Sequence, residues 1–282
     1  MCVTRIKVNA AETKWKALFS KPWLLPDRVL AYVLVKLRQR VTLSADSFGW
    51  LQTVLYFGVD DWGRYASVTR QIKTLDDAPV AVLDVGGGSG TIREFLDSKR
   101  YCLCVLDINI QTLARIDDSR LGVVAGDGCC LPFKDNSFDV VTSIASLEHV
   151  PDTMKADYCR ELKRVANRYV IIHCPADSSD GGFQGTIYDA KFLEWYRQRF
   201  KKDESNTLEH LNSGLPKVDE LRKLFPKASV TGKQNANVWF RYVTISYTPY
   251  IRFSTGLLYK LRLQKKDDMP PYHACLLIWR KG

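Results

Sequence analysis

Short runs of apolar and β-branched residues recur between residues 80 and 279, and stretches with apolar residues at helical spacing separate them. Such runs predict buried strands, and their alternation with helices predicts an α/β fold with a largely parallel sheet. The predicted strands are 80–85, 101–106, 122–125, 138–143, 169–174, 228–231 and 272–279. The predicted helices lie around 92–96, 113–116, 154–165, 192–200 and 218–225.

Two segments fall outside this alternation. Residues 1–77 carry aromatic and apolar residues at near-helical spacing, and their last helix is expected to begin in a turn at 60–65 and end near Leu75. We therefore predict an N-terminal helical cap over 1–77 and one α/β domain over 78–282. Within that domain the connection 233–271 is an insertion rich in aromatic and basic residues.

The motif around which the chain is organised follows the first predicted strand. Gly86, Gly88 and Gly90 give the pattern G-x-G-x-G, whereas the dinucleotide fingerprint is G-x-G-x-x-G and Thr91 occupies its last position. Asp84 precedes the glycines by two residues. Its carboxylate would repel a pyrophosphate and attract an ammonium group, so the motif predicts a nucleoside ligand with a cationic amino-acid tail.

These residues resemble the first motif of the class I S-adenosylmethionine-dependent methyltransferases, D/E-x-G-x-G-x-G. The stretch 138–152, which reads F-D-x-V and then L-E-H-V-x-D, is typical of the group (methyltransferase type 11) that includes the ubiquinone and menaquinone biosynthetic enzymes. The resemblance implies a Rossmann-like seven-stranded sheet with the last strand antiparallel, helices on both faces and an N-terminal helical lid. It also implies S-adenosyl-L-methionine as the cofactor.

The resemblance assigns cofactor-binding roles to nine residues. Asp107, which ends the second predicted strand 19 residues after Gly88, would accept the ribose hydroxyls; a helix N-cap is the alternative reading of Asp107. Asp127 would bind the adenine amino group and the backbone of Gly128 a ring nitrogen. The full set is Asp84, Gly86, Gly88, Gly90, Asp107, Ile108, Asp127, Gly128 and Ser143. In the family, a segment before the first strand often folds over the cofactor, so Arg64 and Tyr65 could also reach the methionine carboxylate. Packing or surface roles are the alternative interpretation of these two residues.

Three of the four histidines are candidates for a catalytic base, which methyl transfer needs only for a weakly nucleophilic hydroxyl or an acidic carbon. His149, just after the fourth strand, is the best placed of them, with packing as its alternative role. His210 lies in a predicted loop over 209–216, His173 is expected to be a satisfied core histidine, and His273 is expected to be structural. The eight cysteines contain no C-x-x-C pair, so we expect reduced thiols and no metal ion.

The distribution of positive charge along the chain indicates what kind of acceptor the protein could bind. The chain has a net charge of +10, with an excess of seven positive charges in each of 1–44 and 232–282 and a net −4 between them. Aromatic and basic ends would suit an anionic or membrane-bound acceptor, although the same aromatics could form the insertion's own core. No apolar run reaches 18 residues, so no transmembrane helix is predicted. We expect a cytoplasmic protein, with the inner face of the membrane as a further location.

The sequence thus predicts a methyltransferase acting on a small-molecule, lipid or glycan-linked acceptor. An RNA methyltransferase is the alternative enzyme, since a basic surface with aromatics can bind RNA; no nucleic-acid signature follows the fourth strand. A non-catalytic scaffold with a methyltransferase-like fold is the third hypothesis, and the intact acidic and glycine motifs argue against it.

Overall fold

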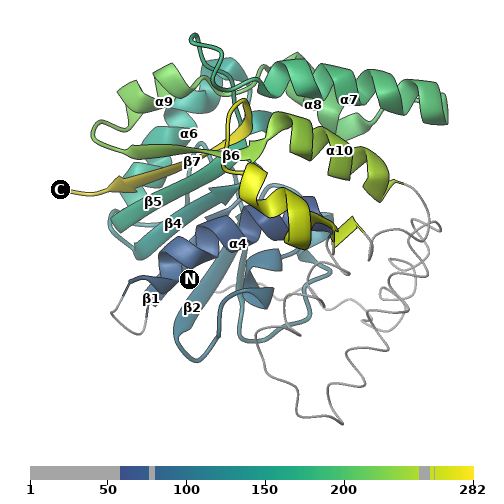
Figure 1. Ribbon diagram of the computed structural model, residues 1–282. Coiled ribbons are helices and arrows are strands. Elements are labelled where there is room, and N and C mark those ends of the chain that lie inside the picture. Colours follow the sequence, from purple (N-terminus) through teal and green to yellow (C-terminus); the bar gives the residue numbers. More distant parts are fainter. Residues whose placement is uncertain (1–57, 76–79, 248–254, 257) are drawn as a thin grey trace.

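A computed structural model describes residues 58–75, 80–247, 255, 256 and 258–282 (Figure 1). Its centre is a seven-stranded sheet in the order β3-β2-β1-β4-β5-β7-β6. β7 runs antiparallel to both of its neighbours, and the other strand pairs are parallel. The strands are β1 Val80–Val85, β2 Tyr101–Asp107, β3 Gly122–Ala125, β4 Phe138–Ile144, β5 Ala166–Pro175, β6 Ser229–Asn235 and β7 Tyr272–Arg280. The predicted sheet, including its antiparallel last strand, is confirmed.

Helices cover both faces of the sheet, as predicted (Figure 1). α6 and α9 pack on one face and α4 on the other, while α7, α8 and α10 gather near the ends of the strands. The helices are α4 Val59–Lys73, α5 Ile110–Leu113, α6 Asp152–Val165, α7 Gly185–Phe200, α8 Ser205–Ser213, α9 Val218–Leu224 and α10 Ala236–Ser246. Shorter turns are η2 Thr91–Glu94, η3 Leu147–His149, η4 Tyr259–Leu263 and η5 Gln264–Lys266.

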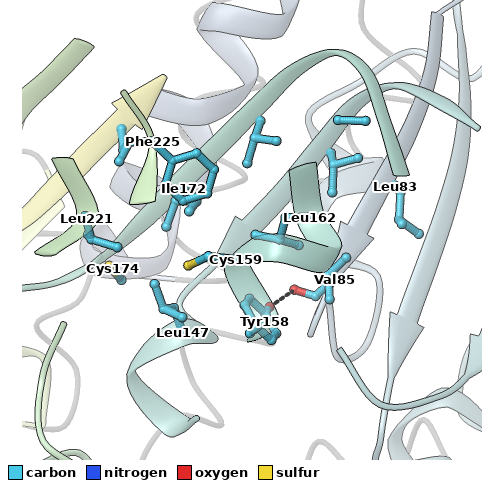
Figure 2. Close-up of a cluster of buried hydrophobic side chains, with 14 of the residues drawn as sticks. Leu83, Val85, Leu147, Tyr158, Cys159, Leu162, Ile172, Cys174, Leu221 and Phe225 are labelled. Atoms are coloured by element: carbon cyan, nitrogen blue, oxygen red, sulfur yellow. Dashed lines mark hydrogen bonds between the residues drawn. The ribbon is translucent and has the colours of Figure 1, made fainter. Parts of the chain in front are cut away.

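The strands are apolar on both sides because each side meets a helical layer. Along β5, Ile172 packs in the core under α6 and α9, and the neighbouring Ile171 packs in the core under α4. α6 contributes Tyr158, Leu162 and Val165 at the spacing of one helix face, and all three are buried. Figure 2 shows Tyr158 and Leu162 within this core. The two cores therefore hold the carboxyl ends of β1, β4 and β5 in one rigid edge.

The helix predicted after the glycine turn is wrong in length. Only η2 forms there, because the backbone N–H groups of Arg100 and Tyr101 bond to the carbonyl of Asp97 and start β2 directly. The helix predicted to follow Asn109 and to contain Leu113 and Ile116 begins where expected but ends early, since α5 covers Ile110–Leu113. The turn expected at 60–65 is instead the first part of α4.

The predicted loop 209–216 is also wrong, because α8 extends to Ser213. The side chain of Glu204 accepts the N–H of Thr207 at 2.8 Å and caps the start of α8. At its other end, the ammonium of Lys155 on α6 donates to the carbonyls of Ser213 and Gly214 at 3.2 and 2.7 Å. A cap supplied from 58 residues away leaves no local sequence signal.

The aromatic residues of the insertion mostly form a core of their own. Trp239, Tyr242 and Tyr259 are buried in a third cluster with Phe192 and Tyr196 of α7. This outcome favours the internal-core reading of these aromatics over an exposed aromatic surface. The predicted lid before residue 58 lies outside the described residues. Among the described residues, no helix is both long and apolar enough to cross a membrane.

Candidate functional site

The glycine turn after β1 lies at the carboxyl edge of the sheet, between the ends of β1 and β2. Gly86, Gly88 and Gly90 all have positive φ, of 72°, 53° and 71°, a conformation that glycine adopts without strain. A Cβ at Gly86 would lie 1.9 Å from the Ser146 hydroxyl, whereas a Cβ at Gly88 would meet nothing within 4 Å. Gly86 is therefore held by packing, and Gly88 faces open space that a ligand could fill.

Asp107 ends β2 directly beside Gly88. Its Oδ2 accepts the backbone N–H of Gly88 at 2.8 Å, and its Oδ1 accepts the N–H of Asn109 at 2.8 Å. Each carboxylate oxygen can accept a further hydrogen bond, so the fixed carboxylate remains able to bind two hydroxyls. Ile108 follows with 75 % of its surface exposed. The structure thus brings Gly88, Asp107 and Ile108 together, as the sequence predicted.

Asp84 lies beneath the turn and is fully buried. The Thr142 hydroxyl donates to its Oδ1 at 2.8 Å, while Oδ2 has no hydrogen-bond partner among the described residues. A Cβ at Gly87 would lie 2.6 Å from that Oδ2, which places the unpaired oxygen directly under the turn. Burial raises the pKa of Asp84 to about 7, although the hydrogen bond from Thr142 acts to lower it. A cationic group nearby would stabilise the ionised form.

Asp127 and Gly128 follow β3. Ala125 pairs with Asp107 across the two strands, so Asp127 lies two residues past the level of Asp107. Asp127 is exposed, and its Oδ1 accepts the N–H of Cys129 at 2.8 Å. A Cβ at Gly128 would lie 2.3 Å from the Tyr158 ring. Gly128 is therefore required for packing, whatever its backbone binds.

Tyr158 is a positioning residue that sequence reasoning treated only as core. Its hydroxyl donates to the carbonyl of Val85 at 3.2 Å (Figure 2) and lies 3.0 and 3.1 Å from the hydroxyls of Ser143 and Ser146. Ser143, a predicted cofactor residue, is fully buried in this network. The network ties the end of β1 to the end of β4. No sequence signal distinguished this tyrosine from the other members of its helical stripe.

His149 and His210 meet although 61 residues separate them. Their Nε2 atoms lie 3.3 Å apart. The Nδ1 atom of His149 lies 3.2 Å from Glu209, and Nδ1 of His210 lies 3.0 Å from Asp189. Asp189 also accepts a hydrogen bond from His273 at 2.8 Å. His210 therefore reaches the candidate base His149, from a helix rather than a loop.

The electrostatics of this group follow from its burial and pairing. Burial opposes ionisation of Asp189, but His273 and His210 lower its pKa to about 2. Burial acts to lower the pKa of His210, yet the hydrogen bond from its ring to Asp189 leaves that pKa raised. His273 also stacks on Trp239, with ring centroids 3.6 Å apart. The structural role predicted for His273 agrees with these contacts.

Glu148 and His173 are buried beside the same site without hydrogen-bond partners among the described residues. His173 therefore departs from the prediction of a satisfied core histidine. Burial, with a further contribution from Arg64, lowers the pKa of His173 to about 3, so its ring is neutral. We name Glu148, His149 and His210 the histidine cluster, because one ligand atom of each lies within 4.8 Å of the others.

Arg64 and Tyr65 lie on α4, at the other side of the site. Arg64 forms an ion pair with Asp60 one turn earlier. Burial acts to lower the Arg64 pKa, but the negative charges of Asp60, Asp61 and Glu148 leave it raised. Tyr65 stacks on Phe95 at 5.5 Å. Contact of either residue with the methionine carboxylate remains a prediction.

The sheet order with its antiparallel β7, the glycine turn after β1 and the acid after β2 define a class I methyltransferase fold. Residues 83–172 match the family model described as "Methyltransferase domain" (Methyltransf_11). The family uses S-adenosyl-L-methionine. The unpaired Asp84 oxygen, the open position at Gly88 and the exposed Ile108 fit such a ligand.

Curated relatives agree with the family. The chain is 34 % identical over 140 residues to the demethylmenaquinone methyltransferase of Mycolicibacterium gilvum, covering 48 % of this chain and 58 % of that one. It is 34 % identical over 140 residues to the ubiquinone/menaquinone biosynthesis C-methyltransferase UbiE of Stenotrophomonas maltophilia, covering 45 % and 53 %. The chain spans about half the length of the curated relatives it matches.

Solved structures also resemble the chain. The YcgJ protein of Bacillus subtilis aligns at 18 % identity with a TM-score of 0.47, covering 77 % of this chain and 100 % of that one.

Proposed function

We propose that this protein is an S-adenosyl-L-methionine-dependent methyltransferase that acts on a small-molecule acceptor. The observation that carries the proposal is the arrangement around Gly88. Of the glycines in the turn, Gly88 has open space where a Cβ would lie, and its N–H donates to Asp107. An oxygen of Asp84 without a hydrogen-bond partner among the described residues lies beneath the same turn. A nucleoside with a cationic tail complements both carboxylates.

Different residues of the site would bind different parts of the cofactor. Asp107 would accept the ribose hydroxyls and Ile108 would cover one face of the adenine, with Asp127 and the backbone of Gly128 at its edge. Asp84 would favour the ammonium end of the methionine part, and the backbone at Gly86, Gly88 and Gly90 would let the cofactor approach closely. Ser143 would act through Tyr158, which fixes the ends of β1 and β4.

When bound, the cofactor supplies the methyl group and its sulfonium leaving group. The chain's own residues hold the donor in line with the acceptor and exclude water. His149 is the proposed base for an acceptor that must lose a proton, with its Nε2 facing His210. The names of the two relatives support a quinone-type precursor as the first acceptor class to assay.

The relatives' names and the architecture favour a small molecule over RNA. Trp239, Tyr242 and Tyr259 of the insertion are buried, which removes them as exposed stacking surfaces. Nor does their burial support a membrane-facing aromatic surface. The proposal also includes lipid and glycan-linked acceptors, which should be assayed beside the quinone precursors.

Calorimetric titration of the full chain with S-adenosylmethionine tests the proposal. We expect binding to one site, and Asp107→Ala should weaken it by about ten- to a hundredfold, because buried ribose hydroxyls lose their acceptor. Asp135→Ala is the matched control: this exposed carboxylate pairs with Arg164 just before β4, at the opposite edge of the sheet. Absence of binding in folded protein, or equal effects of the two variants, would contradict the proposal.

A further inference from the structure

Within the histidine cluster, the imidazole rings of His149 and His210 face each other through their Nε2 atoms. A carboxylate accepts hydrogen bonds, so the Nδ1 atom of His210 donates to Asp189. The Nδ1 atom of His149 lies 3.2 Å from Glu209, at ion-pair distance. When each ring carries its proton on Nδ1, facing these carboxylates, both rings present the lone pair of Nε2 to each other. These two Nε2 atoms lie 3.3 Å apart. Two lone pairs at this distance repel each other unless a cation lies between them.

Glu148 decides which cation fits. Its side chain is fully buried, and neither carboxylate oxygen has a hydrogen-bond partner among the described residues. A proton shared between the two imidazoles would leave both oxygens of this carboxylate without a hydrogen bond, which is costly in a buried site. A divalent ion would bind the carboxylate and both nitrogens at once.

We propose that Glu148, His149 and His210 bind one divalent transition-metal ion. Nitrogen ligands at about 2.0–2.1 Å from a zinc-like ion lie roughly 2.8–3.4 Å apart for right-angled to tetrahedral geometry, and the observed separation of 3.3 Å lies at the tetrahedral end. All three ligand atoms lie within 4.8 Å of one another, so a small shift of the carboxylate completes the set. Two imidazoles and one carboxylate favour Zn²⁺, Fe²⁺, Co²⁺ or Mn²⁺ over Mg²⁺ and Ca²⁺.

The surroundings have the form of a supported metal site. Ligating histidines in proteins commonly donate their second ring N–H to a carboxylate, which fixes the ring; Asp189 and Glu209 occupy these positions. Asp189 is itself held by His273 on β7. α8, which carries His210, is anchored at its end by Lys155. The ligands thus come from two elements that packing holds in place.

The site also lies beside the glycine turn, and in this respect the inference rests on the proposed function. Glu148 follows Ser146 by two residues, and the Ser146 hydroxyl fills the space next to Gly86. His149 is about one-third exposed, so the ion would keep positions open toward the acceptor. An acceptor hydroxyl bound there would have a lowered pKa and would release its proton to water. With the ion bound, His149 is therefore a metal ligand, and the base role proposed above applies to the metal-free site. The inference departs from the sequence expectation of no metal.

Titration of the full chain with Co²⁺ after chelator treatment and dialysis tests the site. Visible absorption and elemental analysis should show one equivalent of Co²⁺ per chain, and the thermal midpoint should rise because the ion binds the folded state. Glu148→Gln and His210→Ala should each weaken Co²⁺ binding at least tenfold. Glu209→Gln, which changes only a supporting carboxylate, should weaken it by a smaller factor.

The controls separate this site from the thiols and from the cofactor site. Cys130→Ser removes an exposed thiol outside the cluster and should leave Co²⁺ affinity unchanged. No bound Co²⁺ in folded protein, equal affinity in Glu148→Gln, or loss of binding in Cys130→Ser would overturn the proposed site. S-adenosylmethionine binding is measured on the same samples: cofactor binding without Co²⁺ rejects only the metal site, and Co²⁺ binding without cofactor rejects only the proposed function.

Discussion

The glycine turn and the histidine cluster lie at the same edge of the sheet but are built in different ways. The turn joins two consecutive strands, and its main contact, from Gly88 to Asp107, spans 19 residues. The histidine cluster joins η3 to α8 across 61 residues and depends on side chains from α6, α7 and β7. The first is specified by a local motif and the second only by the folded chain.

Within the turn, Gly86 is needed for packing, whereas Gly88 is proposed to face the ligand. Gly86→Ala should cause the largest effect, a loss of about 3–5 kcal/mol of unfolding free energy. The new methyl group would overlap the Ser146 hydroxyl, and alanine would be strained at φ 72°. Denaturant unfolding measures this loss, and a change below about 1 kcal/mol would contradict the packing role.

Gly88→Ala sharpens the same comparison. The methyl group meets no protein atom, so only the positive φ should cost stability, about 1–2 kcal/mol. Because the methyl would project into the proposed ligand space, S-adenosylmethionine affinity should fall at least tenfold. Calorimetry on the folded variant measures this, and unchanged affinity would mean that the cofactor does not approach Gly88.

The pH dependence of cofactor binding tests Asp84. The folded-state pKa of about 7 means that Asp84 becomes protonated as the pH falls below 7. A cationic ligand prefers the ionised form, so affinity should fall by up to about tenfold between pH 7 and pH 6. In Asp84→Asn this part of the pH dependence should vanish. An equally steep profile in that variant would assign the titration to another group.

The raised pKa of Asp84 has a consequence for the free protein as well. Between its unfolded value near 3.8 and about 7, the folded state holds more protons than the unfolded state. Stability from this group is therefore present at low pH and is lost as the pH rises through that window. Cofactor binding should restore part of it above pH 7.

Tyr158→Phe is expected to have the smallest effect. Phenylalanine keeps the packing of the ring but removes the hydroxyl that bonds to Val85, Ser143 and Ser146. A loss of about 1–2 kcal/mol of unfolding free energy should follow, with a modest decrease in cofactor affinity as β1 and β4 loosen. If the affinity for S-adenosylmethionine were unchanged, Tyr158 would contribute to stability but not to cofactor binding.

The sequence was sufficient for the sheet and for the turn because both depend on local patterns. Apolar runs marked all seven strands, and the spacing from Gly88 to Asp107 placed those residues together. Helix lengths were harder to predict. η2 stays short because Asp97 starts the turn into β2, and α8 extends to Ser213 because Lys155 caps it from α6. Neither cause is visible in a local window.

The histidine cluster could not be predicted from the sequence, because it too depends on contacts between residues far apart in the chain. His149 and His210 were separate candidates, and nothing along the chain paired them or indicated Asp189 as their support. Glu148 belongs to the conspicuous L-E-H-V stretch, yet its burial without a partner appears only in the folded chain. Buried polar side chains without partners were therefore the signal that the structure added.

A structure of the full chain in complex with S-adenosylhomocysteine tests the central claim most directly. We expect both ribose hydroxyls within hydrogen-bond distance of the Asp107 carboxylate, the adenine against Ile108, and the amino-acid tail over Gly86 and Gly88. A nucleoside bound away from Asp107, or at a site that leaves the space above Gly88 empty, would contradict it.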